Sequence, residues 1–292
     1  MLGIIKSHLT FFFILAVMLC AAGCEEEPPF IDLSKPAQKL QDTNYIVTPI
    51  PAAQEKRVLL EDISGVKCVN CPDAATKADE LKILHGEKLV VVTLMPDKAL
   101  LANFTDPDPD YAQVSNPQVT QLLNSLNPPS AMPLGMINRT NNGNGLMVVY
   151  QRWPGDVQTE LSKTNTVNID IETSFDNATR KLLVTATITY TETPTDLDQS
   201  MSIILTESNI IGKQKKTSGD DYNYEFKHVA RNFATNPLGD PLPKNLEKGR
   251  QIKRQYAIDV LPNWDIAHCE VVLLVHSSAN KVVYHVAEKK AI

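Results

Sequence analysis

The spacing of apolar residues changes near residue 166, and this change limits the fold more than any other feature of the chain. Before it, apolar runs at residues 57–63 and 88–95 are typical of buried strands, and residues 71–86 carry apolar side chains at helical spacing. After it the period becomes two, as in "KLLVTATITY" at residues 181–190, and further strands follow without helices between them. The pattern predicts an α/β domain followed by an all-β antiparallel sandwich.

Composition supports a folded chain and argues against one class of partner. The 292 residues are 43% hydrophobic and 21% charged, so the chain has enough apolar material to bury, and its length is typical of about two domains. The net charge is −6 and the sequence has no basic stripe, so nucleic acid is a poor partner. We expect residues 208–249 to form a long, loop-rich connection within the second domain.

The first residues have the composition of an export signal. Lys6 and His8 precede an apolar run at residues 9–20, which is shorter than the about 20 residues that a membrane-spanning helix needs. The small residues of "AAGC", which ends at Cys24, resemble a bacterial lipobox. The resemblance implies that residues 1–23 are a lipoprotein signal peptide and that Cys24 is lipidated. The alternative is a secreted protein in which Cys24 stays free.

Residues 24–42 are rich in proline and charge, which predicts a tether between membrane and body. The acidic run Glu25, Glu26 and Glu27 resembles a surface-export signal of lipoproteins in one group of Gram-negative bacteria. The alternative is a simple solvated tether. The expected partners are the outer membrane, through lipid on Cys24, and unidentified proteins, and no cofactor is expected.

A C-x-x-C pair, Cys68 and Cys71, stands between a predicted strand and the helix that follows it. Unpaired N–H groups and partial positive charge at a helix N-terminus stabilise a thiolate, and Lys67 adds charge beside it. Cys68 would then be an exposed nucleophile, and Cys71 the buried thiol that resolves a mixed disulfide. The competing interpretation is a static disulfide that fixes the start of the helix. A zinc site is disfavoured because no second C-x-x-C or close histidine pair completes it.

Two residues outside the pair are spaced as in a known redox fold. Asp62 lies six residues before Cys68, and Pro133 stands in "SAMPLGMINR", just before a predicted strand. Together with the C-x-x-C pair they resemble thioredoxin. The resemblance implies that Asp62 accepts a proton from Cys71, and that Pro133 follows a cis peptide bond and lies beside the sulfur atoms as a platform for substrate. The dipeptide "VN" between the cysteines differs from the one in thioredoxin, so the resemblance does not give the redox potential of the pair.

Longer segments extend the likeness over most of the chain. They are "KRVLLEDISGVKCVNCP", "MPLGMINR", "HVAR" and "NPLGDPL". From about Lys56 to its C-terminus, the chain resembles the outer-membrane protein twenty-eight family of exported lipoproteins. The resemblance implies a lipid anchor, a thioredoxin-like domain at residues 43–164 and an immunoglobulin-like β-sandwich domain at residues 165–292. It also implies residence in the outer membrane, lipid-anchored and displayed at the cell surface, with adhesion or binding as the expected activity.

The sequence around the remaining candidate residues indicates structural roles for them. The "DPDPD" segment at residues 106–110 imitates the start of a calcium loop, but Tyr111 and Pro117 stand where such a loop requires glycine and glutamate. We therefore expect a solvated acidic loop. Cys269 alternates with apolar neighbours in "CEVVLLVH", which is typical of a small buried core residue.

The sequence therefore supports two functions. The first is an outer-membrane or cell-surface lipoprotein that binds proteins or other macromolecules in adhesion or assembly. The alternative is a membrane-anchored thiol–disulfide oxidoreductase that uses Cys68, Cys71, Asp62 and Pro133. Redox potential separates the two, because known oxidoreductases lie between about −120 and −270 mV, whereas structural disulfides usually lie below about −300 mV.

Overall fold

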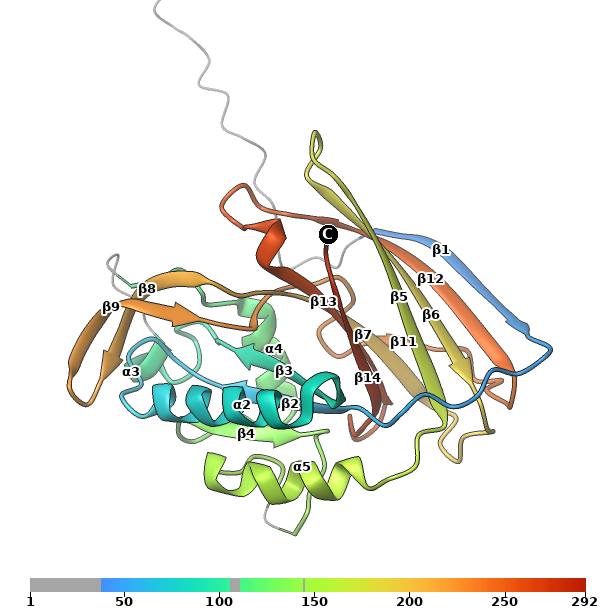
Figure 1. Ribbon diagram of the computed structural model, residues 1–292, viewed down its shortest axis with the longest axis horizontal. Helices are drawn as coiled ribbons and strands as arrows, with labels where there is room; N and C mark the ends of the chain where they lie inside the picture. Colours follow the sequence, from blue (N-terminus) through green and yellow to red (C-terminus); the bar gives the residue numbers. More distant parts are fainter. Residues whose placement is uncertain (1–37, 106–110, 144) are drawn as a thin grey trace, which may run out of the picture. The chain divides into compact units, whose positions relative to one another are not determined.

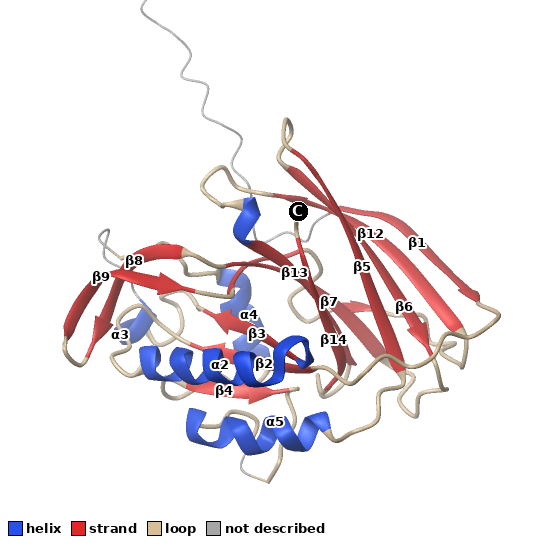
Figure 2. Ribbon diagram, in the orientation of Figure 1, coloured by secondary structure: helices blue, strands red, loops and turns tan. Residues whose placement is uncertain are grey.

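The computed structural model describes residues 38–105, 111–143 and 145–292, and these residues form mostly β-sheet with few helices (Figures 1 and 2). The strands of the first half are β1 (Gln38–Ile46), β2 (Val58–Ile63), β3 (Leu89–Leu94) and β4 (Leu134–Ile137). Its helices are α2 (Cys71–His85), α3 (Ala102–Thr105), α4 (Pro117–Ser125) and α5 (Trp153–Leu161).

The second half is built from strands. They are β5 (Val167–Asp176), β6 (Lys181–Tyr190), β7 (Gln199–Glu207), β8 (Ile210–Lys216), β9 (Gly219–Phe226), β10 (Val229–Phe233), β11 (Asp240–Pro241), β12 (Arg250–Asp259), β13 (Cys269–Ser277) and β14 (Val283–Lys290). The expectation of a loop-rich connection at residues 208–249 was wrong, because this segment contains β8 to β11. Its short strands, broken by turns, obscure the period of two.

One mixed sheet contains strands from both halves of the chain. Its strand order is β14-β13-β7-β10-β3-β2-β4, and β11 pairs with β7. β2 and β3 are parallel, β4 is antiparallel to β2, and β10 meets β3 at the pair Val229 and Thr93. Backbone hydrogen bonds therefore cross the predicted domain boundary between residues 164 and 165, and the division into two domains stays a prediction.

A second, antiparallel sheet has the order β1-β12-β6-β5. The alternating residues of β6 point from this sheet into an apolar core that it shares with β7 and β13 of the mixed sheet. The buried members from these three strands are Leu182, Val184, Ala186, Ile188, Tyr190, Met201, Ile203, Leu205, Cys269, Val271, Leu273 and Val275. The period of two in the sequence thus marks the faces that two packed sheets bury against each other.

Helices cover both faces of the strands β2, β3 and β4, which lie between α2 and α4 in the ribbon view (Figure 1). On one face, Val58 and Leu60 of β2 pack with residues of α2 and with Trp153 of α5. On the other, Leu59 and Ile63 pack with the apolar side of α4. Every residue of β2 is buried for this reason, and its sequence is a nearly continuous apolar run.

Helix α2 begins and ends where its sequence predicts. Pro72 occupies the first turn, where a missing N–H is not needed, and Gly86 ends the helix with a φ of 57° and donates its N–H to the carbonyl of Lys82. Among the described residues, no helix is both long and apolar enough to cross a membrane.

Glu61 of β2 forms a buried ion pair with Arg139. The guanidinium of Arg139 donates to both carboxylate oxygens of Glu61, at 2.7 and 2.8 Å, and neither side chain is exposed to solvent. We predict that Glu61→Gln lowers the free energy of unfolding by about 3–5 kcal/mol, because it leaves the Arg139 charge buried and unpaired. Urea denaturation measures the change.

The control is an exposed ion pair of the same chain. Lys181 and Asp259 lie 2.6 Å apart on adjacent strands, and both are about half exposed. Asp259→Asn should therefore cost less than about 1 kcal/mol. Equal losses in Glu61→Gln and Asp259→Asn would contradict the role given to the buried pair.

Candidate functional site

The turn between β2 and α2 carries a closed disulfide. Cys68 and Cys71 are bonded to each other, and Cys71 is the first residue of α2. The turn is tightened by two backbone hydrogen bonds, from the N–H of Cys68 to the carbonyl of Gly65 and from the N–H of Cys71 to the carbonyl of Cys68. The pair thus fixes the first turn of the helix to the turn that precedes it.

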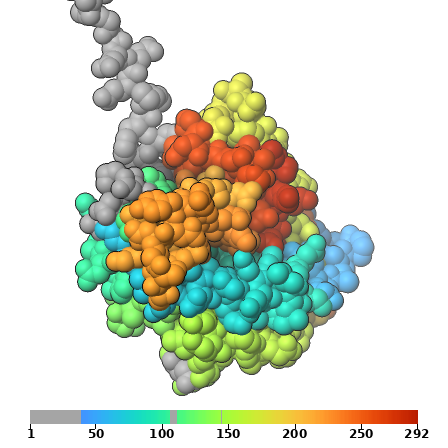
Figure 3. Space-filling view, turned by 60° about the vertical axis from the view of Figure 1, so that its left-hand side comes forward, coloured from blue at the N-terminus to red at the C-terminus, as the bar shows by residue number. Residues whose placement is uncertain are grey.

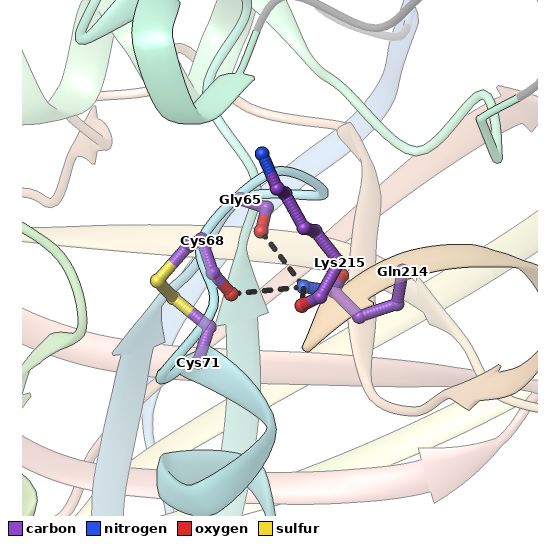
Figure 4. The surroundings of a disulfide bond; sticks show 5 residues. All are labelled: Gly65, Cys68, Cys71, Gln214 and Lys215. Carbon is purple, nitrogen blue, oxygen red and sulfur yellow. Dashed lines mark hydrogen bonds between the residues drawn. A yellow bond between two sulfur atoms is a disulfide. The ribbon is translucent and has the colours of Figure 1, made fainter. Parts of the chain in front are cut away.

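Cys68 is not the exposed residue that the sequence predicted. It is 1% exposed and Cys71 is 2% exposed. Both cysteines pack in the apolar cluster that includes Leu100 and Met132. The hairpin of β8 and β9, about 150 residues further along the chain, holds the backbone of the turn. The buried side-chain amide of Gln214 donates to the carbonyls of Cys68, at 3.0 Å, and Gly65, at 3.3 Å (Figure 4). The burial of Cys68 therefore results from tertiary packing that a local motif cannot reveal.

Further backbone contacts hold the turn from two sides. The N–H of Lys215, in the hairpin, donates to the carbonyl of Val66 at 2.9 Å. The N–H of Lys67 donates to the carbonyl of Phe104 in α3, also at 2.9 Å. The polar backbone groups of the turn are thus bonded to protein rather than to water, which stabilises the closed arrangement.

The hairpin is anchored by close packing against the segment that follows α3. A Cβ added to Gly212 would lie 2.5 Å from the Cβ of Ala112, so only glycine fits this approach of the two backbones. The ammonium of Lys213 lies 4.5 Å from the centre of the Tyr111 ring, within the range of a cation–π contact. The alternation of Tyr222, Tyr224 and Phe226 in β9 is the sequence signal that could have revealed the hairpin.

Asp62 lies on the face of β2 that is turned toward α2. Its side chain is 1% exposed, and neither carboxyl oxygen has a hydrogen-bond partner among the described residues. Burial raises the pKa of Asp62 to about 7 because the charged form is poorly solvated there. The carboxyl group lines a cavity of about 300 Å³ that Pro72, beside Cys71, also lines. Its predicted role as the proton acceptor for Cys71 stays a prediction.

Pro133 lies near the same end of β2. The Met132–Pro133 peptide bond is cis, as the sequence predicted, and Leu134, the next residue, pairs with Ile63 at the end of β2. Met132 belongs to the same buried apolar cluster as Cys68 and Cys71. The fold thus brings Pro133 to the region of the cysteine pair, and its role as a substrate platform stays a prediction.

The sequence also singled out Cys24, the acidic segment at residues 106–110 and Cys269. Cys24 and the acidic segment at residues 106–110 lie outside the described residues. Cys269 is buried in the core between the two sheets, and burial raises the pKa of its thiol to about 12. Within residues 38–105, 111–143 and 145–292, no group of side chains is arranged to hold a metal ion.

Comparison with known proteins gives one family and several related structures. The family description "Outer membrane protein Omp28" matches residues 123–292. HBP35 of Porphyromonas gingivalis aligns with a TM-score of 0.62 and 16% identity over 82% of this chain and 76% of that chain, which is a likeness of fold alone. None of the curated proteins compared with the chain matches it.

Two further solved structures are similar over part or most of the chain. A protein from Agrobacterium tumefaciens aligns with a TM-score of 0.49 and 12% identity, over 82% of this chain and 97% of that chain. A domain of the outer membrane lipoprotein Omp28 from Porphyromonas gingivalis aligns with a TM-score of 0.30 and 18% identity, over 44% of this chain and 89% of that chain.

The buried carboxyl group makes stability depend on pH. The folded pKa of Asp62, about 7, lies above the reference value of 3.8, so the folded state keeps a proton that the unfolded state has lost. Stability contributed by this group is therefore lost as pH rises from about 4 through about 7. We predict that Asp62→Asn stabilises the protein, by about 2–3 kcal/mol more at pH 8 than at pH 5. Urea denaturation at the two pH values measures this difference, and an equal effect at both would contradict it.

Proposed function

We propose, on the premise that the chain belongs to the Omp28 family of outer membrane proteins, that it is a surface-associated lipoprotein whose folded body binds another macromolecule. Its family is one of outer membrane proteins, so the chain resides at the outer membrane. Residues 1–23 would be removed on export, and Cys24 would carry the lipid. The tether expected at residues 24–42 would end before Gln38, because β1 begins there and pairs with β12. Cell-surface display and an adhesion or assembly role are parts of the same proposal.

We further propose that the body has a thioredoxin-like domain at residues 43–164 and an immunoglobulin-like domain at residues 165–292. The strand order β3-β2-β4, with helices on both faces, supports the first assignment. The packing of antiparallel strands from two sheets around one apolar core supports the second. β10 joins the two domains edge to edge, since it pairs with β3 on one side and with β7 on the other.

The observation that carries the binding proposal is the β8–β9 hairpin. Its Gln214 is buried against the cysteine turn, so the hairpin is fixed to the scaffold. Its outward side chains include two large ones, Ile211 and Tyr222, which are 60% and 63% exposed. Exposed aromatic and aliphatic side chains on a rigid support are typical anchors of protein interfaces. The same packing makes the Cys68–Cys71 disulfide a structural element of the binding surface.

A second candidate, the thiol–disulfide oxidoreductase, is favoured by one observation. Asp62 combines deep burial with a pKa near neutrality, which are properties expected of a proton acceptor near a redox pair. Against it, Cys68 is 1% exposed, so a substrate disulfide has no access to its sulfur atom. Exchange chemistry would require the packing around the turn to open first.

Cross-linking on intact cells tests the binding proposal. We predict that a photoreactive phenylalanine in place of Tyr222, in the full-length chain, gives a defined adduct with a partner. Adding Ile211→Ala should reduce the yield about fivefold, which corresponds to about 1 kcal/mol at an interface anchor. The control carries the same photoreactive residue in place of the exposed Leu197, which lies in the loop before β7. The same adducts from both positions would argue against the hairpin.

Reduction kinetics separate the two candidate functions. We predict that glutathione does not reduce the disulfide of the folded protein, and that Gln214→Ala makes reduction about tenfold faster, because loss of two buried hydrogen bonds favours opening of the hairpin. Alkylation of the released thiols measures the rate. Gln255→Ala is the control, since Gln255 bonds to Thr185 on the distant antiparallel sheet. Ready reduction of the wild-type protein, unchanged in Gln214→Ala, would favour the oxidoreductase.

A further inference from the structure

Strand β1 forms an uncovered edge of the antiparallel sheet. It pairs with β12, and no second strand pairs with it among the described residues. Every residue from Lys39 to Ile46 is exposed to solvent. The segment around β1, blue in the space-filling view, lies at the rim of the molecule (Figure 3). Such an edge presents a row of backbone N–H and C=O groups to which another strand can bond.

The opposite edge of the same sheet is occupied by other parts of the chain. The side chain of Gln54 donates to the carbonyl of Ile169 in β5, at 3.3 Å, and accepts from the N–H of the same residue, at 2.9 Å. Further along β5, the Thr173 hydroxyl donates to the carbonyl of Lys290 in β14 at 3.2 Å. A further strand can therefore add to this sheet more easily at β1 than at β5.

The direction of the hydrogen bonds shows which backbone groups of β1 are turned outward. The N–H of Val47, directly after the strand, donates to the carbonyl of Gly249, directly before β12, at 2.9 Å. Because the bonding direction alternates along a strand, the odd-numbered residues from position 41 onward also bond toward β12. The even-numbered residues turn their N–H and C=O groups away from β12, and these residues are Asp42, Asn44 and Ile46.

The features that protect many edge strands are weak in β1. The strand contains no proline, and its bulge lies at one end, between Lys39 and Gln41, so that the remainder is regular. Its two charges are neutralised within the chain, because Lys39 lies 2.8 Å from Asp42, and Asp42 lies 3.1 Å from Arg254. Its large apolar residues are about half exposed, and they are Leu40, Tyr45 and Ile46.

From these features we infer that β1 pairs with β1 of a second copy of this chain, antiparallel and with Thr43 at the two-fold axis. In this register Asp42 faces Asn44 of the second copy, and the symmetry creates the same pair again. Both residues turn their backbone groups outward, so each pair forms two N–H···O=C hydrogen bonds. The two four-stranded sheets thereby become one continuous sheet.

The side chains of β1 are self-complementary in this register. Gln41 faces Tyr45 of the second copy, and at the ends of the pair Leu40 lies near Ile46, so apolar side chains meet each other. No two like charges are opposite. Moving the axis to Asp42, the nearest register that keeps the faces of the sheet aligned, would place two carboxylates opposite each other, which is unfavourable.

The chain before β1 favours a second copy as the partner, and this step rests on the lipid anchor proposed above. Residues 24–37, between the lipid-bearing cysteine and β1, extend at most about 50 Å. Copies anchored in one membrane therefore hold their β1 edges in a thin layer, which raises the effective concentration of one edge for another. In the antiparallel pair the two tethers would leave roughly 35 Å apart, so both reach the same membrane.

Cysteine cross-linking of the purified full-length protein, at about 100 μM in detergent and oxidised by air, tests the pairing. Thr43 would face its own copy with the Cα atoms about 4.5 Å apart, which suits a disulfide. We expect Thr43→Cys to give a disulfide-linked dimer in most molecules. Cys68 and Cys71 are bonded to each other and Cys269 is buried, so they do not interfere. Thr195→Cys, the same change in an exposed loop, should give at least tenfold less dimer.

Further variants test the register and the backbone bonds. Gln41→Cys and Tyr45→Cys should each fail to cross-link alone, because each residue would lie about 14 Å from its own copy. The two proteins mixed should cross-link to each other. Adding Asn44→Pro to Thr43→Cys should lower the yield at least tenfold, since proline removes an N–H that is turned away from β12. Urea denaturation verifies that this variant is folded.

Cross-linking on cells separates this inference from the proposed anchor. Cys24→Ala should lower the yield of the Thr43→Cys dimer on cells about tenfold and leave the purified protein unchanged. An unchanged yield on cells would contradict the anchor and not the pairing. The inference is overturned if purified Thr43→Cys forms no dimer, if Gln41→Cys alone cross-links equally well, or if folded Asn44→Pro leaves the yield unchanged. It is also overturned if lipidated Thr43→Cys on cells is joined to a different protein or forms no dimer.

Discussion

The junction between β3 and β10 determines most of what is distinctive in this protein. The N–H of Thr93 donates to the carbonyl of His228 at 2.7 Å, and the Thr93 hydroxyl donates to the carbonyl of Lys227 at 2.8 Å. These bonds join the sheet of the first half to strands of the second half. Because β9 ends two residues before His228, the same junction directs the hairpin toward the cysteine turn. The hydrogen bonds that hold this turn and the cavity beside α2 both depend on it.

The sequence predicts those features that local spacing determines. Strand β2, the start of α2 at Cys71 and the cis bond before Pro133 are encoded by residues close to one another or by a fixed motif. The burial of Cys68 could not be predicted in this way. It depends on apolar residues of distant segments, among them Leu100 and Met132. It depends also on Gln214, an ordinary polar residue in a segment without a clear period, which bonds to the backbone of the turn. Contacts over such separations leave no pattern in a single sequence.

A redox motif and a structural element can thus share the same residues. What distinguishes them is access, because a thiolate must be reached before it can attack or be attacked. In this chain the helix N-terminus and the buried acid are retained while the approach to the sulfur atoms is closed by packing. The chain belongs to the Omp28 family of outer membrane proteins, and the surface-binding role is our proposal for it.

The order of residues along the chain has a consequence for folding. The cysteine turn lies about 150 residues ahead of the hairpin that bonds to it, so synthesis of the chain produces the turn first. The two cysteines are separated by only three positions, so their bond does not need the later strands in order to form. Both residues are buried once those strands have packed. A covalent link made early is thus enclosed by parts of the protein that arrive late.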